Sequence, residues 1–509
     1  MAAMPLVKLW LDRCDVTHNS SCSLADPSFV PTRLIDLSGK FPKLKVVAKS
    51  ESGVKYATLS HCWGTIKRPV LTGQALPSFC SRIPPAALST TFKDAMMIAQ
   101  YLGFAYIWID SLCIIQDSSD DWRREAALMS LVYGCSGLNI SAAGAADGSI
   151  GCFFEQQESF VKYIKEHISS GVSSNGTNSP DGPLMRRGWC LQERLLAPRS
   201  LLCSRSQLFW ECDGLYACEL YPQGYELQGK GRRLRRSNLD LGSTTFSAVT
   251  AWEEVVELYC MCDLTMSRDR LVAISGLARA AASPMLGQYF AGLWRNGMEF
   301  QLCWYQGIEW SSRPDVYRAP SWSWASIDGP KVFYSQEVDI SAPPKNLFVS
   351  VRDVVIQYLE KGNPFGEIVS GTVSINCAHL LRISIGNVEG LAELYTEIFI
   401  EECSTKTIIR QDCTEDFIPG ESGAPIDIFA LPMMDMHGGD ICGLLLVPTG
   451  LSAGQYRRIG HFGFPYQDDP FSAEFEQILL SGRGKVGSDA YAKITRDKSQ
   501  NELRIIDII

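Results

Sequence analysis

The sequence predicts an α/β fold: a parallel sheet with helices on both faces, then a helical extension and a β-rich C-terminal domain. Short apolar runs rich in aromatic and branched residues, at 56–60 and 104–110, are typical of buried strands. Between them, helical spacing of apolar residues over 91–103 indicates a helix, and a strand, helix and strand in succession favour a parallel unit. From about 335 onward, Val, Ile and Thr runs separated by Gly, Pro, Asn and Asp indicate antiparallel strands.

The remaining elements of the first domain follow in chain order. An entry segment contains a predicted short strand at 31–37, and a helix is predicted from Ser118 to about Tyr133, with Ser118 and Asp121 as a capping pair. A stretch rich in Gly, Ser and Asn predicts a flexible insertion at about 156–182.

A chain of 509 residues is too long for one hydrophobic core, because cores stop growing at roughly 250–300 residues. We therefore expect several domains. They are an entry segment at 1–50, a first domain at 51–212, a helical and aromatic extension at 213–334, and a β-rich domain at 335–509, with strands at 368–375, 380–385 and 442–447.

Composition narrows the class of protein. A net charge of −9 argues against a nucleic-acid-binding protein, and the one basic cluster, at 230–236, is interpreted as a solvated loop. Residues 1–11 lack the pattern of a signal peptide, and no apolar run approaches the roughly 20 residues that span a bilayer. The 18 cysteines, many in hydrophobic runs, then fit a reducing compartment, so we expect a soluble cytoplasmic protein with no membrane span.

Three sequence blocks follow one another in the first domain. They are YATLSHCWG at 56–64, YIWIDSLCIIQD at 106–117 and RGWCLQERLLAPR at 187–199. In this order they resemble the heterokaryon-incompatibility (HET) domain, and the Ser60–Gly64 block carries the resemblance most clearly. The resemblance implies a fungal protein of self/non-self recognition that triggers growth arrest or cell death and acts through a protein partner or self-association.

HET domains in turn look like remote relatives of TIR domains. That likeness implies a flavodoxin-like parallel sheet and an NAD hydrolase activity that uses one glutamate. Trp122 and Glu125 resemble the TIR pattern Trp-Cys-x-x-Glu, although the spacing here is one residue shorter and Arg123 stands where the Cys usually lies.

Glu125 is accordingly the first catalytic candidate. Cleavage of the nicotinamide–ribose bond passes through an oxocarbenium-like state with a leaving group that is already cationic, so one carboxylate can supply the stabilisation. The alternative is a structural ion pair between Glu125 and an arginine such as Arg187 or Arg194.

His61, Cys62 and Asp110 form a second candidate set at the ends of the two predicted strands. A Cys62 nucleophile would need His61 as its base, with Asp110 orienting the ring. Neighbouring residues on a strand point to opposite faces, so His61 and Cys62 can pair only if the chain turns there, as Gly64 permits. The alternative, which we favour, is a buried hydrogen-bonded pair of His61 and Asp110.

The third block supplies candidate binding residues. Arg187 or Arg194 could hold the pyrophosphate of NAD, with Trp63 beside them. The alternative is structural: Glu193 and the arginines form internal ion pairs, and Trp63 is a core residue, as are Trp122 and Trp189.

No cofactor is predicted, and NAD is a candidate substrate only. Cys14, His18 and Cys22 are zinc-type ligands, and a fourth ligand would have to come from elsewhere in the chain, for example Cys212 or Cys218. Because this spacing is incomplete, no metal site is predicted.

Two rival functions remain open at this stage. One is a non-enzymatic HET signalling module that acts by self-association. The other is an enzyme that uses a HET scaffold on a small molecule, for example in secondary metabolism, with His61, Cys62 and Asp110 at its site.

Overall fold

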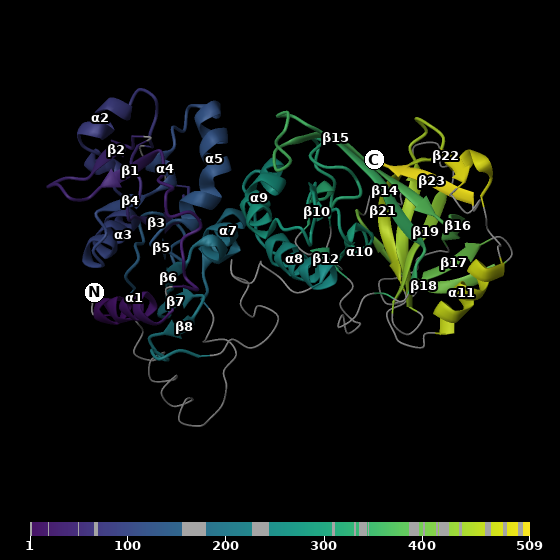
Figure 1. Cartoon of the computed structure of the whole chain (residues 1–509), viewed down its shortest axis with the longest axis horizontal. Helices are drawn as coiled ribbons and strands as arrows, with labels where there is room; N and C mark the ends of the chain where they lie inside the picture. Colours follow the sequence, from purple (N-terminus) through teal and green to yellow (C-terminus); the bar gives the residue numbers. More distant parts are fainter. Residues whose placement is uncertain are drawn as a thin grey trace. The chain divides into compact units, whose positions relative to one another are not determined.

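A computed structural model describes most of the chain (Figure 1), and the description below follows its two compact units separately. One unit comprises Met1–Asp240, Cys262–Leu264 and Ala273–Ala281, and the other comprises Leu241–Met261, Thr265–Val272 and Ala282–Ile509. The described residues are 3–18, 20–48, 50–65, 70–154, 180–225, 244–307, 311–329, 332–334, 344, 346–385, 396–400, 403–413, 416, 427–436, 440–463, 470–481, 486–496 and 502–509. The expected insertion at 156–182, apart from its last three residues, and the basic cluster at 230–236 lie outside them.

The first unit is built on an eight-stranded sheet with the order β2-β1-β4-β3-β5-β6-β7-β8. Its central strands are parallel: β3 pairs with β4 and with β5, and β5 pairs with β6, whereas the outer strands are antiparallel. The predicted α/β fold is therefore confirmed for this unit. The strands are β1 Arg33–Asp36, β2 Lys43–Val46, β3 Ala57–Ser60, β4 Tyr106–Trp108, β5 Leu138–Ser141, β6 Arg199–Cys203, β7 Leu208–Cys212 and β8 Leu215–Cys218.

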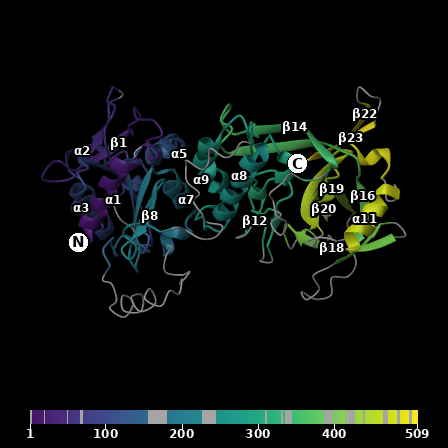
Figure 2. The same cartoon turned by 60° about the horizontal axis from the view of Figure 1, so that its bottom comes forward.

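Helices flank this sheet in both views (Figures 1 and 2). They are α1 Met4–Thr17, α2 Leu76–Ser81, α3 Thr90–Tyr101, α4 Asp110–Cys113, α5 Ser119–Gly134 and α7 Gly188–Leu196, with 3₁₀ turns η1 Pro85–Ala87 and η2 Pro183–Arg186. The predicted cap of α5 is confirmed, because the Ser118 hydroxyl accepts a hydrogen bond from the Asp121 backbone N–H. Helix α1 was not predicted, although its buried Val7, Trp10 and Leu11 have helical spacing.

The order of the parallel strands explains where the helices lie. The chain passes from β3 through α3 to β4 in one direction along the sheet, then through α5 to β5 and through α7 to β6 in the other. Strand–helix–strand connections are right-handed, so connections that run in opposite directions along the sheet place their helices on opposite faces. Helix α3 therefore covers one face, and α5 and α7 share the other. The direction reverses between β3 and β5, and ligands of open α/β sheets bind outside the carboxyl ends of the strands at such a point.

The second unit carries the strand-rich region. Helix α8 Thr245–Cys260 precedes it, and the predicted strands at 368–375, 380–385 and 442–447 are confirmed as parts of β15, β16 and β20. The elements of the eleven-stranded sheet are β13 Asn346–Leu347, β14 Val349–Tyr358, β15 Ile368–Cys377, β16 Leu381–Ile385, β17 Thr396–Ile400, β18 Cys403–Gln411, β19 Ile428–Met436, β20 Asp440–Pro448, β21 Gln455–Gly463, β22 Lys493–Arg496 and β23 Glu502–Ile508. Its pairings are antiparallel except between β21 and β23.

Helix α11, Pro470–Ser481, packs on this sheet and covers its core: Phe475 lies edge-on against Phe462 of β21, with ring centroids 5.5 Å apart. The other elements of the described chain are α9 Arg270–Ala281, α10 Met298–Gln301, β9 Tyr289–Phe290, β10 Leu293–Trp294, β11 Tyr305–Gln306, β12 Val332–Phe333, and the turns η4 Ser267–Asp269, η5 Trp324–Ser326 and η7 Ser488–Ala490. Among the residues described, no helix combines the length and apolarity needed to cross a bilayer.

Candidate functional site

The candidate site lies where β3 and β4 end, at the carboxyl edge of the parallel strands. His61, Cys62 and Trp63 follow β3, and Asp110 follows β4 as the first residue of α4. The chain turns away at Gly64, whose φ is +67° and where an added Cβ would lie 2.3 Å from the Cβ of Asp147. Glycine is required at that position both for the backbone angle and for the space.

His61 is buried at this edge and neutral at ordinary pH. Its ring lies edge-on against Phe92 of α3, with centroids 4.9 Å apart. Burial lowers the pKa of His61, and the positive charge of Arg187 lowers it further, whereas the charge of Asp110 opposes the shift. Nδ1 of His61 is 3.7 Å from Oδ1 of Asp110, so the expected hydrogen-bonded pair is a close polar contact that is too long for a hydrogen bond.

Asp110 and Trp63 form the exposed rim of this arrangement. The Trp63 indole N–H donates to Oδ2 of Asp110 at 2.8 Å, and the Ser111 backbone N–H donates to Oδ1 at 2.6 Å. The side chain of Asp110 is 27% exposed and Trp63 is 42% exposed. The interpretation of Trp63 as a core residue is therefore wrong, because its ring lies at the surface and is held there by Asp110.

Arg187 and Glu193 approach the same edge from α7. Arg187 donates from Nη1 to the backbone carbonyl of His61 at 2.9 Å. Burial raises the pKa of Glu193 to about 7, and the negative charge of Asp110 adds to the shift, while the hydroxyls of Ser60 and Tyr133 and the charge of Arg187 oppose it.

Glu193 is only 6% exposed, and its Oε2 has no hydrogen-bond partner among the described residues. A buried carboxyl oxygen without a partner costs free energy unless the group is protonated or binds something. A carboxyl group with a pKa of about 7 is typical of sites that perform chemistry near neutral pH.

Cys62 faces a different environment from its neighbour His61. It packs with Leu184 and Cys190, and burial raises the pKa of the Cys62 thiol although the charge of Arg187 opposes this. A thiol with a raised pKa is a poor nucleophile. The contacts of His61 run to Phe92, Asp110 and Arg187, so the geometry does not assemble Cys62 and His61 as a nucleophile and its base.

Glu125 is fully buried on α5, in a separate group of charges. Its Oε1 accepts a hydrogen bond from Thr32 at 2.8 Å and lies 3.9 Å from Nη1 of Arg33 and 3.7 Å from Nε of Arg124. Burial raises the pKa of Glu125, with Thr32 and Arg33 opposing the shift. The arginines beside Glu125 are thus Arg33 of β1 and Arg124 of α5, not Arg187 or Arg194, which the sequence suggested.

Arg33 is fixed mainly by another carboxylate. It donates to both oxygens of Asp121, at 2.5 Å and 3.0 Å, and to the carbonyl of Cys113 at 2.6 Å. This bidentate pair ties β1 to the first turn of α5, and Glu125 lies at its side. The sequence singles out Glu125 but not Arg33, whose position depends on the pairing of β1 with β4.

Arg194 also has a structural role. It donates to both carboxylate oxygens of Glu211 on β7, at 2.7 Å from Nε and 2.5 Å from Nη2. Arg194 thus forms an internal ion pair, but its partner is Glu211 and not Glu193, which the sequence suggested. Trp122 and Trp189 are half-buried and lie edge-on to one another, with centroids 6.3 Å apart, so they join α5 to α7 rather than filling a core.

Residues 56–193 match the family model described as Heterokaryon incompatibility protein (HET). The chain contains a HET domain. The match spans β3 through Glu193, and so it includes both strand ends, α5 and the α7 residues of the candidate site. Searches of curated proteins and of solved structures found no similar protein.

Sequence reasoning named every ionisable member of the HET-domain site but gave Glu193 a structural role. The signal that could have identified it is the spacing of Cys190 and Glu193, which places both on one face of α7. Catalysis or binding by Glu125, His61, Cys62, Asp110, Arg187, Arg194 and Trp63 stays a prediction.

Proposed function

We propose that this protein is a self/non-self recognition effector whose HET domain arrests growth or kills the cell by cleaving NAD at its nicotinamide–ribose bond. The observation that carries the proposal is Glu193, a buried carboxyl with a pKa raised to about 7 and one oxygen without a partner among the described residues. Neutral His61 follows β3 at the same carboxyl edge, and Arg187 and Asp110 act electrostatically on both groups. This edge is where open α/β sheets bind ligands.

The groups match the demands of that reaction. When the bond breaks, its electron pair goes to the nicotinamide nitrogen, which becomes neutral, and the ribose develops positive charge. Ionised Glu193 supplies a negative charge for that carbon, and the low-dielectric surroundings strengthen the interaction. Water then forms the new C–O bond and gives a proton to His61, which is unprotonated because burial lowers its pKa.

Two further groups at this edge could bind the rest of the substrate. Arg187 carries a positive charge suited to the pyrophosphate, and the exposed ring of Trp63 offers a surface for stacking an aromatic base. Arg194 has no such role in the proposal, because its Nε and Nη2 both donate to the carboxylate of Glu211.

The test uses the purified full-length chain, concentrated or crowded, with NAD, and measures free nicotinamide. We expect release by the wild type and a loss of about 10²–10⁴-fold in His61→Gln, the range for a general base. A wild type that releases no nicotinamide contradicts NAD cleavage. If such a protein still arrests growth on overexpression in a fungal host, and His61→Gln does so equally, the HET domain acts as a non-enzymatic module.

A further inference from the structure

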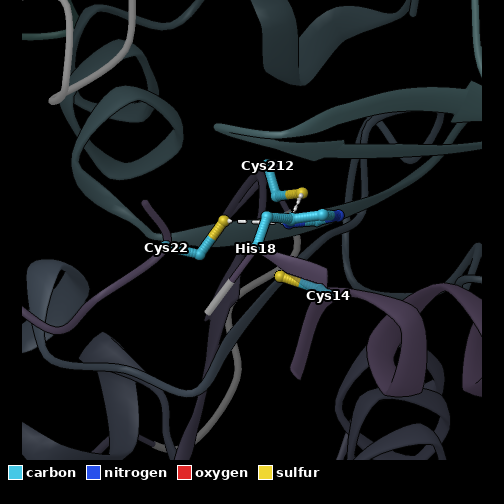
Figure 3. Close-up of side chains that lie close together, drawn as sticks. All are labelled: Cys14, His18, Cys22 and Cys212. Atoms are coloured by element: carbon cyan, nitrogen blue, oxygen red, sulfur yellow. Dashed lines mark hydrogen bonds between the residues drawn. The ribbon is translucent and has the colours of Figure 1, made fainter. Parts of the chain in front are cut away.

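Four metal-ligating side chains converge at the other end of the first unit, away from the residues used above. They are Cys14 at the end of α1, His18 and Cys22 in the loop that follows, and Cys212 at the end of β7 (Figure 3). Their ligand atoms all lie within 4.8 Å of one another. The three cysteines are buried and His18 is half-buried.

The spacing of these atoms matches a tetrahedral ion. Zn–S bonds of about 2.3 Å and Zn–N bonds of about 2.0–2.1 Å set an S···N edge of roughly 3.6 Å in a tetrahedron. Nδ1 of His18 lies 3.5 Å from Sγ of Cys22 and 3.6 Å from Sγ of Cys212 (Figure 3). The histidine therefore already turns one ring nitrogen toward two of the sulfurs at the distances that a shared zinc ion requires.

A positively charged neighbour of the four side chains favours the thiolate form of cysteine. Arg199 donates from Nε to Sγ of Cys14 at 3.1 Å and is itself held by Asp15 at 2.8 Å. An Nε–H that points at a ligand sulfur is the kind of outer contact that orients and stabilises a metal-bound thiolate.

The turn between β7 and β8 is shaped around the histidine. An added Cβ at Gly214 would lie 2.5 Å from Cγ and 2.7 Å from Nδ1 of His18, so only glycine leaves room for the ring in this position.

We propose that Cys14, His18, Cys22 and Cys212 bind one structural zinc ion. Four protein ligands complete the tetrahedral shell and leave no position for a substrate, which is the pattern of structural rather than catalytic zinc. The ion joins α1 and its following loop to the β7–β8 hairpin, at the edge of the sheet opposite β2. This site lies outside residues 56–193, so it is an addition of this chain to the matched HET model.

Cys218 provides a matched control. It lies on the same hairpin, is equally buried, and packs among Ala143, Leu202 and Phe209 instead of joining the four ligands. Cys212→Ala and Cys218→Ala thus remove the same thiol from neighbouring strands, but only the first removes a ligand.

The experiment measures zinc in the full-length protein by elemental analysis, after purification without chelator. We expect about one zinc per chain in the wild type and in Cys218→Ala, and a loss of most of it in Cys212→Ala. Gly214→Ala, which displaces the His18 ring, should weaken zinc binding by about 10–100-fold in a chelator competition. Stripping zinc from the wild type should lower its Tm, and added zinc should restore it.

The wild-type measurement decides the question even where a variant fails to fold. A wild type without zinc, both as purified and after incubation with excess zinc under reducing conditions, overturns the proposal. So does a disulfide between two of the cysteines in place of the metal, or a Cys212→Ala protein that retains as much zinc as Cys218→Ala.

Discussion

The two units each bury a cluster of charged side chains, and the clusters differ in how completely their groups are paired. In the second unit, Arg458 and Asp412 are fully buried side by side, and Arg458 donates to both Asp412 oxygens at 3.0 Å and 3.2 Å. Nη1 and Nη2 also donate to the carbonyls of Leu302, at 2.6 Å, and Trp304, respectively. Each of the three guanidinium nitrogens of Arg458 has at least one acceptor.

The cluster at the carboxyl edge of the HET domain is less complete. One oxygen of Glu193 has no partner among the described residues, His61 and Asp110 stand 3.7 Å apart, and Asp110 is partly exposed. A saturated cluster such as that of Arg458 holds the chain together, because any change in it breaks a bond. A cluster whose polar atoms are incompletely paired can accept a ligand or a proton. We therefore assign the chemistry to the cluster in the first unit.

The largest expected effect on stability concerns the buried Arg458–Asp412 pair. Arg458→Met leaves Asp412 buried without its main partner and should lower the unfolding free energy of the second unit by about 3–5 kcal/mol. Hydrogen exchange of the β21 amides measures this. The double variant Arg458→Met, Asp412→Leu should recover most of the loss, and a double variant as unstable as the single one would contradict the account.

A pH series tests the carboxyl-edge cluster. The pKa of Glu193 is raised to about 7 in the folded protein from 4.5, so the unfolded state releases this proton first. The stability that protonated Glu193 contributes is complete below pH 4.5 and is lost as the pH rises to about 7, which amounts to about 3 kcal/mol.

The comparison with Glu193→Gln isolates that contribution, because glutamine does not titrate. Urea titrations at each pH should show the wild type losing stability relative to Glu193→Gln between pH 4.5 and 7. Parallel curves for the two proteins would show that Glu193 is not perturbed in this way.

The smallest expected effect concerns Glu125. Gln can still accept the Thr32 hydrogen bond, and Arg33 keeps both bonds to Asp121, so Glu125→Gln should change stability by no more than about 1 kcal/mol. Thermal unfolding of the full chain checks this. A loss as large as that predicted for Arg458→Met would mean that Glu125 holds β1 to α5.

Much of the first unit can be predicted from the sequence because local signals and tertiary structure agree there. Apolar runs give β3 and β4, helical spacing gives α3, and Ser118 marks the start of α5. The strand-rich character of the C-terminal region follows from composition in the same way.

Contacts between side chains that are far apart in the chain could not be predicted from the sequence. Arg33 reaches Asp121, and Cys212 reaches His18, only because elements far apart in the chain pack together in the fold. The exposure of Trp63 likewise depends on its bond to Asp110 of the neighbouring strand end. Residue type therefore indicates which groups can do chemistry, whereas burial and partners decide which of them are free to do it.

The most direct test of the central claim compares nicotinamide release by Glu193→Gln and Glu125→Gln, two buried glutamates on neighbouring helices, each replaced by its neutral isostere. We predict that Glu193→Gln lowers the rate by about 10²–10³-fold and that Glu125→Gln stays within about twofold of the wild type. The reverse result, with activity lost in Glu125→Gln and kept in Glu193→Gln, would contradict the assignment and place the chemistry at α5.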